Sequence, residues 1–152
     1  MAFCSVIFFL DTLGKIRRGY SHALEPVCRR WDLTRNALDV LLFLHNNPEF
    51  DRAADLVSRR GIAKSHVSLA VSQLEARGLL VRVFRQEDRR TAHLQLTAPG
   101  SAIAREGQVV QEQFFSRLYG GIPRTELEAQ QQLLKQIRAN MDRMEQECER
   151  SL

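Results

Sequence analysis

Polar side chains with DNA-binding chemistry share one face of a candidate helix between residues 63 and 77. Val67, Ala70, Val71 and Leu74 recur at helical spacing and would be buried on the opposite face. Hydroxyl and ammonium groups bind phosphate oxygens, a histidine or serine bonds to base edges, and a leucine contacts a thymine methyl group. We therefore expect this helix to contact DNA through Lys64, Ser65, His66, Ser68, Leu69 and Ser72.

A charged loop after this helix is the second candidate contact with DNA. Residues 80–84 and 92–97 alternate between apolar and polar positions, which predicts two half-buried strands of a hairpin, with His93 and Gln95 on the polar side. The loop between the strands, residues 85–91, is long and charged, and an arginine guanidinium fits the narrow, negative minor groove. Its candidate DNA-contacting residues are Arg85, Asp88, Arg89 and Arg90.

The net charge of +4 is concentrated in the same part of the chain. Residues 58–90 carry eight Lys or Arg against three Asp or Glu, a net +5. Residues 1–57 are neutral, with seven of each sign, and residues 91–152 carry seven basic against eight acidic residues. A localised basic patch is typical of a site for a polyanion, although a solvated charged surface without a partner has the same charge pattern.

The histidines and cysteines form no recognisable metal or catalytic motif. The four histidines, at positions 22, 45, 66 and 93, include no helical i, i+4 pair and have no acidic residue at a matching spacing. The three cysteines, Cys4, Cys28 and Cys148, are odd in number and widely spaced, which argues against disulfides or a zinc site and indicates reduced thiols. We therefore predict no catalytic residue, no metal site and no cofactor, and an enzyme would need a site assembled through tertiary contacts.

The start of the chain has the pattern of an amphipathic helix. Its apolar stripe runs from Phe3 to Leu24, and Phe8 and Phe9 widen it beyond what the surface of a monomer needs. Pro26 would end or kink this helix, because proline disfavours helical geometry in the residue before it. A short link containing Trp31 would follow.

Two further helices would precede the DNA-contacting helix. Thr34 is a candidate N-cap of a core helix that stops at Asn46-Asn47-Pro48. The buried positions of that helix would be Leu38, Leu41, Leu42 and Leu44. Asp51 is a candidate N-cap of a short third helix, and Gly61 after it is free to take the left-handed conformation of a tight turn.

The last third of the chain would form two terminal helices. Thr97 and Pro99 suit the start of the first, and the run 120–123 separates it from the second. The buried face of the first would contain Ile103, Val110, Phe114 and Leu118. From Leu134 onward the apolar spacing of three and four is that of a packed helix pair. We expect these helices to dimerise, because a chain of this size has little core left to cover them; an antiparallel pair within one chain is the alternative.

This order of elements predicts a mainly α fold with a small β-hairpin wing, the winged helix-turn-helix. In that fold the second helix enters the major groove and the hairpin reaches the minor groove. The expected divisions are residues 1–30 and 99–152 for dimerisation and 31–98 for DNA binding. With 152 residues, 44% hydrophobic and 26% charged, the chain is globular, and no apolar run reaches the roughly 20 residues of a membrane span. We expect no signal peptide and a cytoplasmic protein.

The stretch from Leu33 to Gly100 resembles the MarR family of bacterial transcriptional regulators. Its most specific part, DRRTAHLQLTAPG at residues 88–100, is similar to the family's wing pattern of Asp-x-Arg, an alternating strand and Leu-Thr-x-x-Gly. AKSHVSLAVSQLEARGLLVR, at residues 63–82, is similar to its recognition helix and wing entry. The resemblance implies that Asp88 orients Arg90, that Arg90 enters the minor groove, and that the terminal helices form the dimerisation domain.

Two positions depart from the family's pattern. Ala63 stands where the family often has a serine cap, so one capping hydrogen bond worth about 1 kcal/mol is lost. Leu69 stands where many members have an arginine or another polar base-reading residue. The family's base preference therefore does not carry over to this chain.

The residues and the resemblance together predict a sequence-specific regulator of transcription. We expect a homodimeric repressor that binds a pseudo-palindrome of double-stranded DNA, with half-sites about one helical turn apart. A small-molecule effector would bind between the dimer base and the DNA-binding lobe, and no residue is assigned to it. Two alternatives stay open: a winged-helix module that binds a protein partner, and a regulator that senses oxidants through Cys4 or Cys28.

Overall fold

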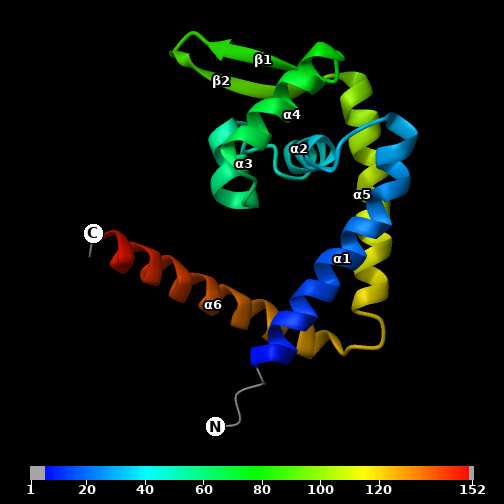
Figure 1. Cartoon of the computed structure of the whole chain (residues 1–152), viewed down its shortest axis with the longest axis vertical. Helices are drawn as coiled ribbons and strands as arrows, with labels where there is room; N and C mark the ends of the chain where they lie inside the picture. Colours follow the sequence, from blue (N-terminus) through cyan, green and yellow to red (C-terminus); the bar gives the residue numbers. More distant parts are fainter. Residues whose placement is uncertain (1–5, 151–152) are drawn as a thin grey trace. The chain divides into compact units, whose positions relative to one another are not determined.

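The computed structural model describes residues 6–150, which form six helices and one two-stranded antiparallel sheet (Figure 1). The elements are α1 (Val6–Trp31), α2 (Arg35–Asn46), α3 (Ala53–Arg60), α4 (Lys64–Ala76), β1 (Leu80–Arg85), β2 (Asp88–Leu96), α5 (Ala98–Leu118) and α6 (Arg124–Arg150). This order confirms the predicted mainly α fold with a hairpin wing. The chain divides into two compact units, the first ending at Phe114 and the second beginning at Phe115.

Helix α2 is the centre of the first unit and packs against α1, α3 and α4. Its predicted N-cap is confirmed, because the Thr34 hydroxyl accepts the N–H of Ala37 at 3.2 Å. The four leucines predicted to face inward are all buried. Since each buried leucine contributes about 1.5–3 kcal/mol, this helix provides much of the apolar stabilisation of the unit.

Helix α1 continues through Pro26 to Trp31, so the prediction of a link around Trp31 is wrong. A proline inside a helix removes one backbone hydrogen bond and costs about 3 kcal/mol. Tertiary contacts on both sides offset this cost: Leu24 and Val27 are buried, and the Trp31 indole N–H donates to Glu106 Oε2 at 2.9 Å. At the other end of α1 the apolar side chains are exposed, as the width of the stripe predicted; Phe3 lies outside the described residues.

Helix α3 begins one residue later than predicted, and Asp51 is not its cap. The N-cap residue is Arg52, whose backbone N–H donates to Asp55 Oδ2 at 3.1 Å. The Asp51 carboxylate points instead to the hairpin. At the other end of α3, Gly61 has a φ of +71° and makes the predicted tight turn to α4.

Helix α4 lies on the core through the four apolar residues that the sequence assigned to its buried face. Gly78, with a φ of +67°, ends the helix, and the N–H of Leu79 donates to the carbonyl of Leu74 at 2.9 Å. The Arg77 guanidinium donates to the backbone carbonyls of Trp31 and Asp32, at 2.7 Å each. These bonds tie the end of α4 to the junction between α1 and α2.

The wing is longer and more exposed than the alternation predicted. Strand β2 begins at Asp88, so most of the predicted loop 85–91 is strand, and the turn is formed by residues 86 and 87. The register shifts between Phe84 and Arg85, because Phe84 pairs with Ala92 and Arg85 with Asp88. In β1 only Leu80 is buried, which contradicts the half-buried strand expected there. His93, predicted on the polar side, is buried.

Helix α5 begins where the sequence predicted. The Thr97 hydroxyl accepts the N–H of Gly100 at 3.3 Å and donates to the carbonyl of Gly78 at 2.7 Å, so the cap also ties α5 to the end of α4. A Cβ at Gly100 would lie 1.9 Å from the carbonyl oxygen of Leu79, so only glycine allows this approach. Of the predicted apolar face, Ile103 is buried and the other three residues are partly exposed.

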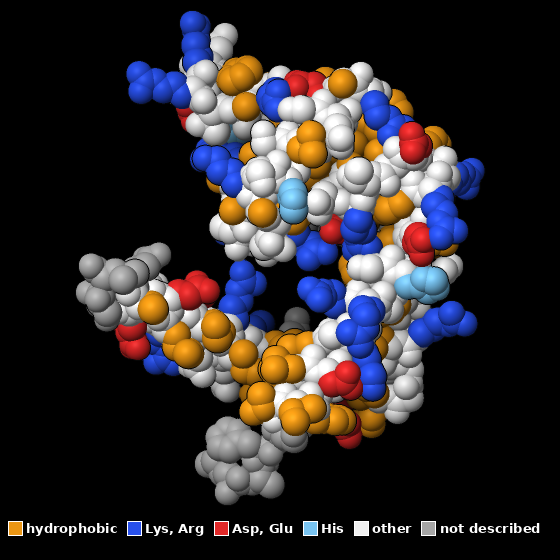
Figure 2. Space-filling view, in the orientation of Figure 1, with side chains coloured by type: hydrophobic (Ala, Val, Ile, Leu, Met, Phe, Trp, Pro, Cys, Tyr) orange, Lys and Arg blue, Asp and Glu red, His pale blue; other side chains and the backbone are white. Residues whose placement is uncertain are grey.

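The second unit consists of the end of α5 and the helix α6. Large apolar side chains remain exposed along α6, and Figure 2 shows them along the face of the helix in view. The exposed residues are Leu133, Leu134, Ile137, Met141 and Met144. No helix of the described residues is long and apolar enough to cross a membrane.

Candidate nucleic-acid interface

The candidate recognition residues share the exposed face of α4. All six, Lys64, Ser65, His66, Ser68, Leu69 and Ser72, are exposed, while the opposite face of the helix is buried. Leu69 is 58% exposed among polar neighbours, which leaves its methyl groups free for an apolar contact. Ala63 provides no side-chain cap, so the first N–H groups of α4 are open to an anion such as a DNA phosphate.

Cationic side chains gather at the tip of the wing, at the upper left of Figure 2. Arg89 and Arg90 are exposed there at the start of β2. Asp88 Oδ1 accepts the backbone N–H groups of Arg90 and Thr91, at 3.2 Å each. The Thr91 side chain, and then these two N–H groups, lower the pKa of Asp88 below its ordinary value. Asp88 therefore fixes the backbone that carries the two arginines.

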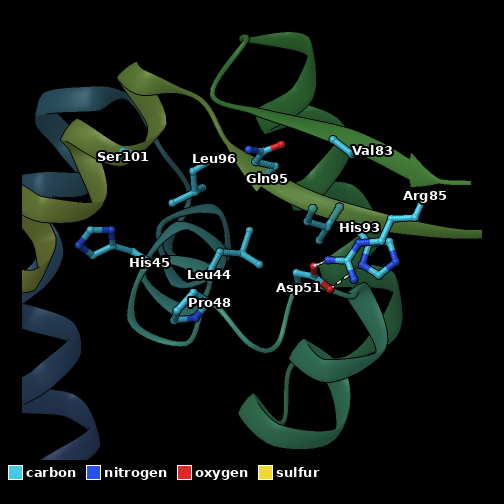
Figure 3. A pocket seen from close by; sticks show the side chains of 11 residues that line it. Leu44, His45, Pro48, Asp51, Val83, Arg85, His93, Gln95, Leu96 and Ser101 are labelled. Carbon is cyan, nitrogen blue, oxygen red and sulfur yellow. Dashed lines mark hydrogen bonds and ion pairs between the residues drawn. The ribbon is translucent and has the colours of Figure 1, made fainter. Parts of the chain in front are cut away.

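Arg85, the fourth residue predicted for the wing, has a partner within the chain. Its Nη2 lies 2.8 Å from Asp51 Oδ2, and its side chain is 57% exposed (Figure 3). The other oxygen, Asp51 Oδ1, lies 2.7 Å from Nδ1 of the buried His93. The sequence missed this cluster, because 42 residues separate Asp51 from His93 and no local pattern relates them. A cleft of about 490 Å³ opens beside the cluster between α2, the wing and the start of α5.

Most other arginines of the basic segment are also paired. Arg60 lies 3.3 Å from Asp39, Arg82 forms an ion pair with Glu75, and the guanidinium of Arg59 stacks over Phe50. Within the described side chains, Lys64, Arg77, Arg89 and Arg90 are the cations of residues 58–90 with no acidic partner within 4.0 Å, and Arg77 is held by the two backbone carbonyls. The charge free to meet a polyanion therefore lies at the start of α4 and at the tip of the wing.

A second polar cluster lies where α1 meets α2. Arg35 Nη2 donates to Asp39 Oδ1 at 3.0 Å, and its guanidinium lies 4.8 Å from the ring centre of Tyr20. Arg35 Nε and Nη1 are buried and have no hydrogen-bond partner among the described residues. An unsatisfied buried guanidinium nitrogen is costly, so these atoms favour an acceptor that the chain itself does not supply.

The cysteines and other candidate ligands form no site among the residues that the structure describes. Cys28 is partly buried, and burial raises the pKa of its thiol, which disfavours the reactive thiolate. Cys148 is exposed, and Cys4 lies outside the described residues. Residues 6–148 contain no group of three His, Cys, Asp or Glu side chains that could hold a metal ion.

Comparisons with known proteins agree with this geometry. Residues 31–91, from the end of α1 to the start of β2, match the model of the MarR family. A MarR-family regulator from Listeria monocytogenes, solved with a 26mer DNA, superposes with a TM-score of 0.77 over 87% of both chains at 19% identity. CouR from Rhodococcus jostii RHA1, solved with p-coumaroyl-CoA, superposes with a TM-score of 0.72 over 88% of this chain and 92% of CouR at 24% identity. At these identities the two structures establish the fold.

A similar sequence is that of the transcriptional repressor MprA of Escherichia coli. The two chains are 29% identical over 94 residues, which is 62% of this chain and 53% of MprA. The chain therefore matches about half the length of this relative.

Proposed function

We propose that the chain is a member of the MarR family, whose model matches residues 31–91, and that it is a sequence-specific, DNA-binding regulator of transcription. The observation that carries the proposal is the position of the unpaired cations. Lys64 lies at the start of the exposed face of α4, and Arg89 and Arg90 lie at the tip of the wing. One winged-helix unit thus carries unpaired cations at two separate places, and these can bind the phosphates of a major groove and of the minor groove next to it.

Each predicted contact has a distinct role in this proposal. Helix α4 enters the major groove, where Lys64, Ser65 and Ser68 bind phosphates and the other three residues meet base edges or a thymine methyl. Arg90 enters the minor groove, with Arg89 beside it, and Asp88 orients the backbone of the turn. DNA binding belongs to residues 31–98, and dimerisation belongs to residues 1–30 and 99–152.

The exposed apolar helices support a homodimer. The side chains of α1 from Val6 to Leu10 and the apolar residues of α6 are exposed in the single chain. Such faces are rarely left open on a monomer, and burial against a second copy would remove them from water. A two-fold dimer presents two copies of α4, so the proposed operator is a pseudo-palindrome.

We further propose that the protein is a repressor and that a small-molecule effector controls its binding to DNA. The relative from Escherichia coli is described as a repressor, and CouR was solved with p-coumaroyl-CoA. The two buried nitrogens of Arg35 suit an acidic small molecule that would bind beside Tyr20. The activity is binding without catalysis, and a regulator of this kind acts in the cytoplasm.

The proposal is tested by fluorescence anisotropy with the DNA upstream of the protein's own gene and a scrambled control, across a salt series. We expect tight binding to the first DNA alone, with log affinity falling linearly with log salt. The variants Arg90→Ala and Lys64→Ala should weaken it. Equal, weak binding to both DNAs, with no motif enriched from random DNA, would instead favour the protein-interaction module.

A further inference from the structure

Asp51 makes three polar contacts with the wing, and Figure 3 shows the two that its carboxylate makes. Its Oδ1 lies 2.7 Å from His93 Nδ1, and its Oδ2 accepts Arg85 Nη2 at 2.8 Å. Its backbone carbonyl accepts the N–H of Leu94 at 2.6 Å. Because a carboxylate only accepts hydrogen bonds, His93 donates from Nδ1. One residue just before α3 thus holds both strands of the hairpin.

The position of these contacts relates them to the tip. Arg85 is the last residue of β1 and pairs with Asp88, directly after the shift in register. Such irregularities bend a strand and change the direction of its end. The Asp51 contacts therefore lie at the point from which the turn carrying Arg89 and Arg90 projects.

Apolar packing of Leu80, Leu94 and Leu96 and the ion pair of Arg82 with Glu75 hold the base of the wing, but the outer part of β1 has little burial. Beyond Leu80, the apolar residues of β1 are exposed: Val81 to 42%, Val83 to 38% and Phe84 to 56%. A two-stranded hairpin is at best marginally stable by itself, so its direction depends on what anchors it. His93 is only 4% exposed, and a buried hydrogen bond to a charged group is costly to break.

We propose that Asp51 is a positioning residue for the wing, and that Arg85 anchors the wing to it rather than contacting DNA. The clamp of Asp51, Arg85 and His93 sets the direction of the tip, so that Arg90 meets the minor groove when α4 lies in the major groove. This inference rests on the proposed DNA-binding function, but the clamp itself is measurable without DNA.

The first experiment uses the full chain without DNA. A spin label on Gln86→Cys, with the three native cysteines replaced by serine, reports the motion of the exposed turn. In Asp51→Asn an amide replaces one acceptor oxygen with a donor, so it cannot accept from both Arg85 and His93. We expect a more mobile label in this variant and an unchanged label in Asp55→Asn, a carboxylate of α3 that bonds to Arg52 instead. Equal mobility in both variants would overturn the clamp.

The second experiment measures DNA affinity by anisotropy in a double-mutant cycle of Asp51→Asn and Arg90→Ala. If Asp51 acts through the wing, the single change weakens binding about ten-fold, and the double variant binds within about two-fold of Arg90→Ala alone. A double variant weakened by the product of the two single losses would show that Asp51 acts elsewhere. If Asp51→Asn unfolds, as judged by circular dichroism, Arg85→Gln replaces it in both experiments.

The salt dependence tests the role of Arg85. A residue that binds a phosphate contributes about one to the slope of log affinity against log salt. In the Arg90→Ala background, where the minor-groove arginine of the wing is already absent, we expect Arg85→Gln to leave this slope unchanged, whereas Lys64→Ala should reduce it further. A slope reduced in Arg85→Gln as much as in Lys64→Ala would make Arg85 a DNA contact and overturn its role as an anchor. Failure of every variant to bind any DNA, with the label mobilised as expected, would reject the proposed function but not the clamp.

Discussion

Helix α4 and the wing both carry residues proposed to contact DNA, but they are held in different ways. Four apolar side chains bury the inner face of α4, and glycine turns fix both ends of the helix. The wing is packed on the core at its base, through Leu80 and Leu94, but its outer part has little apolar burial and is held by the polar contacts of Asp51. Apolar packing does not depend on the ionisation of any one side chain, whereas removal of one partner from a charged clamp leaves the other unpaired. The wing should therefore be the part of the interface that is easier to misplace.

The largest difference that we predict between α4 and the wing is in how much a truncated apolar side chain lowers the free energy of unfolding. Leu74→Ala removes a fully buried side chain of α4 and should lower the free energy of unfolding by about 2–5 kcal/mol. Val83→Ala, on the exposed strand β1, should cost less than about 1 kcal/mol. Urea unfolding of both variants at one protein concentration measures the two losses. Equal losses would mean that the wing is packed as tightly as α4.

The next effect concerns the unpaired cations. Arg90→Ala should weaken operator binding by about 1–3 kcal/mol, or about five- to 150-fold, because a guanidinium in the minor groove is lost. Arg90→Lys should recover part of the loss, since its charge is retained but its planar fork is not. Anisotropy at fixed salt measures both variants. If the Arg90→Ala protein bound the operator with wild-type affinity, the proposal that the wing contacts DNA through Arg90 would be wrong.

A smaller effect is expected at the start of α4, which lacks a side-chain cap. Ala63 has a φ of −56° and a ψ of 140°, which suits an N-cap, so Ala63→Ser should raise the free energy of unfolding by about 1 kcal/mol. Ala76→Ser, at the other end of the helix, is the matched control and should bring no gain. Thermal unfolding of the two variants measures the change in stability that each serine brings. A gain in both variants, or in neither, would contradict the interpretation of the first turn as uncapped.

The smallest effect concerns pH and the turn of the wing. The folded-state pKa of Asp88 is lowered from its ordinary value of 3.8, chiefly by the Thr91 side chain. A lowered folded pKa gives stability that is complete above the unfolded value and is lost as the pH falls through the folded value. The amide signals of Arg90 and Thr91 should therefore titrate together with a midpoint below 3.8. Asp88→Asn should abolish the titration, and a midpoint at or above 3.8 would contradict the account.

Local patterns predicted α4 well because its structure depends on near neighbours in the sequence. The burial of Val67 and Leu74 follows from helical spacing, and the turn at Gly61 follows from the freedom of glycine. The caps at Thr34 and Thr97 also act within three residues. The face proposed to read DNA could therefore be assigned before the structure was known.

The errors occurred where distant contacts override local preference. Nothing near Asp51 predicts that its carboxylate bonds to His93 and Arg85 rather than capping α3. Helix α1 continues to Trp31, where a link was predicted, because contacts with the core and with α5 hold the helix on both sides of Pro26. The pairing of Arg85 with Asp88 likewise depends on the register of the whole hairpin. Each error concerns an interaction that sequence spacing does not encode.

Selection of binding sites from random double-stranded DNA by the purified chain tests the central claim most directly. We expect enrichment of a pseudo-palindrome whose half-site centres lie about one helical turn apart, because each copy of α4 would read one half-site. The same selection with Arg90→Ala should give weaker enrichment of the same core motif. Recovery of no motif, or of a single half-site without symmetry, would contradict the claim that the chain reads DNA as a winged-helix dimer.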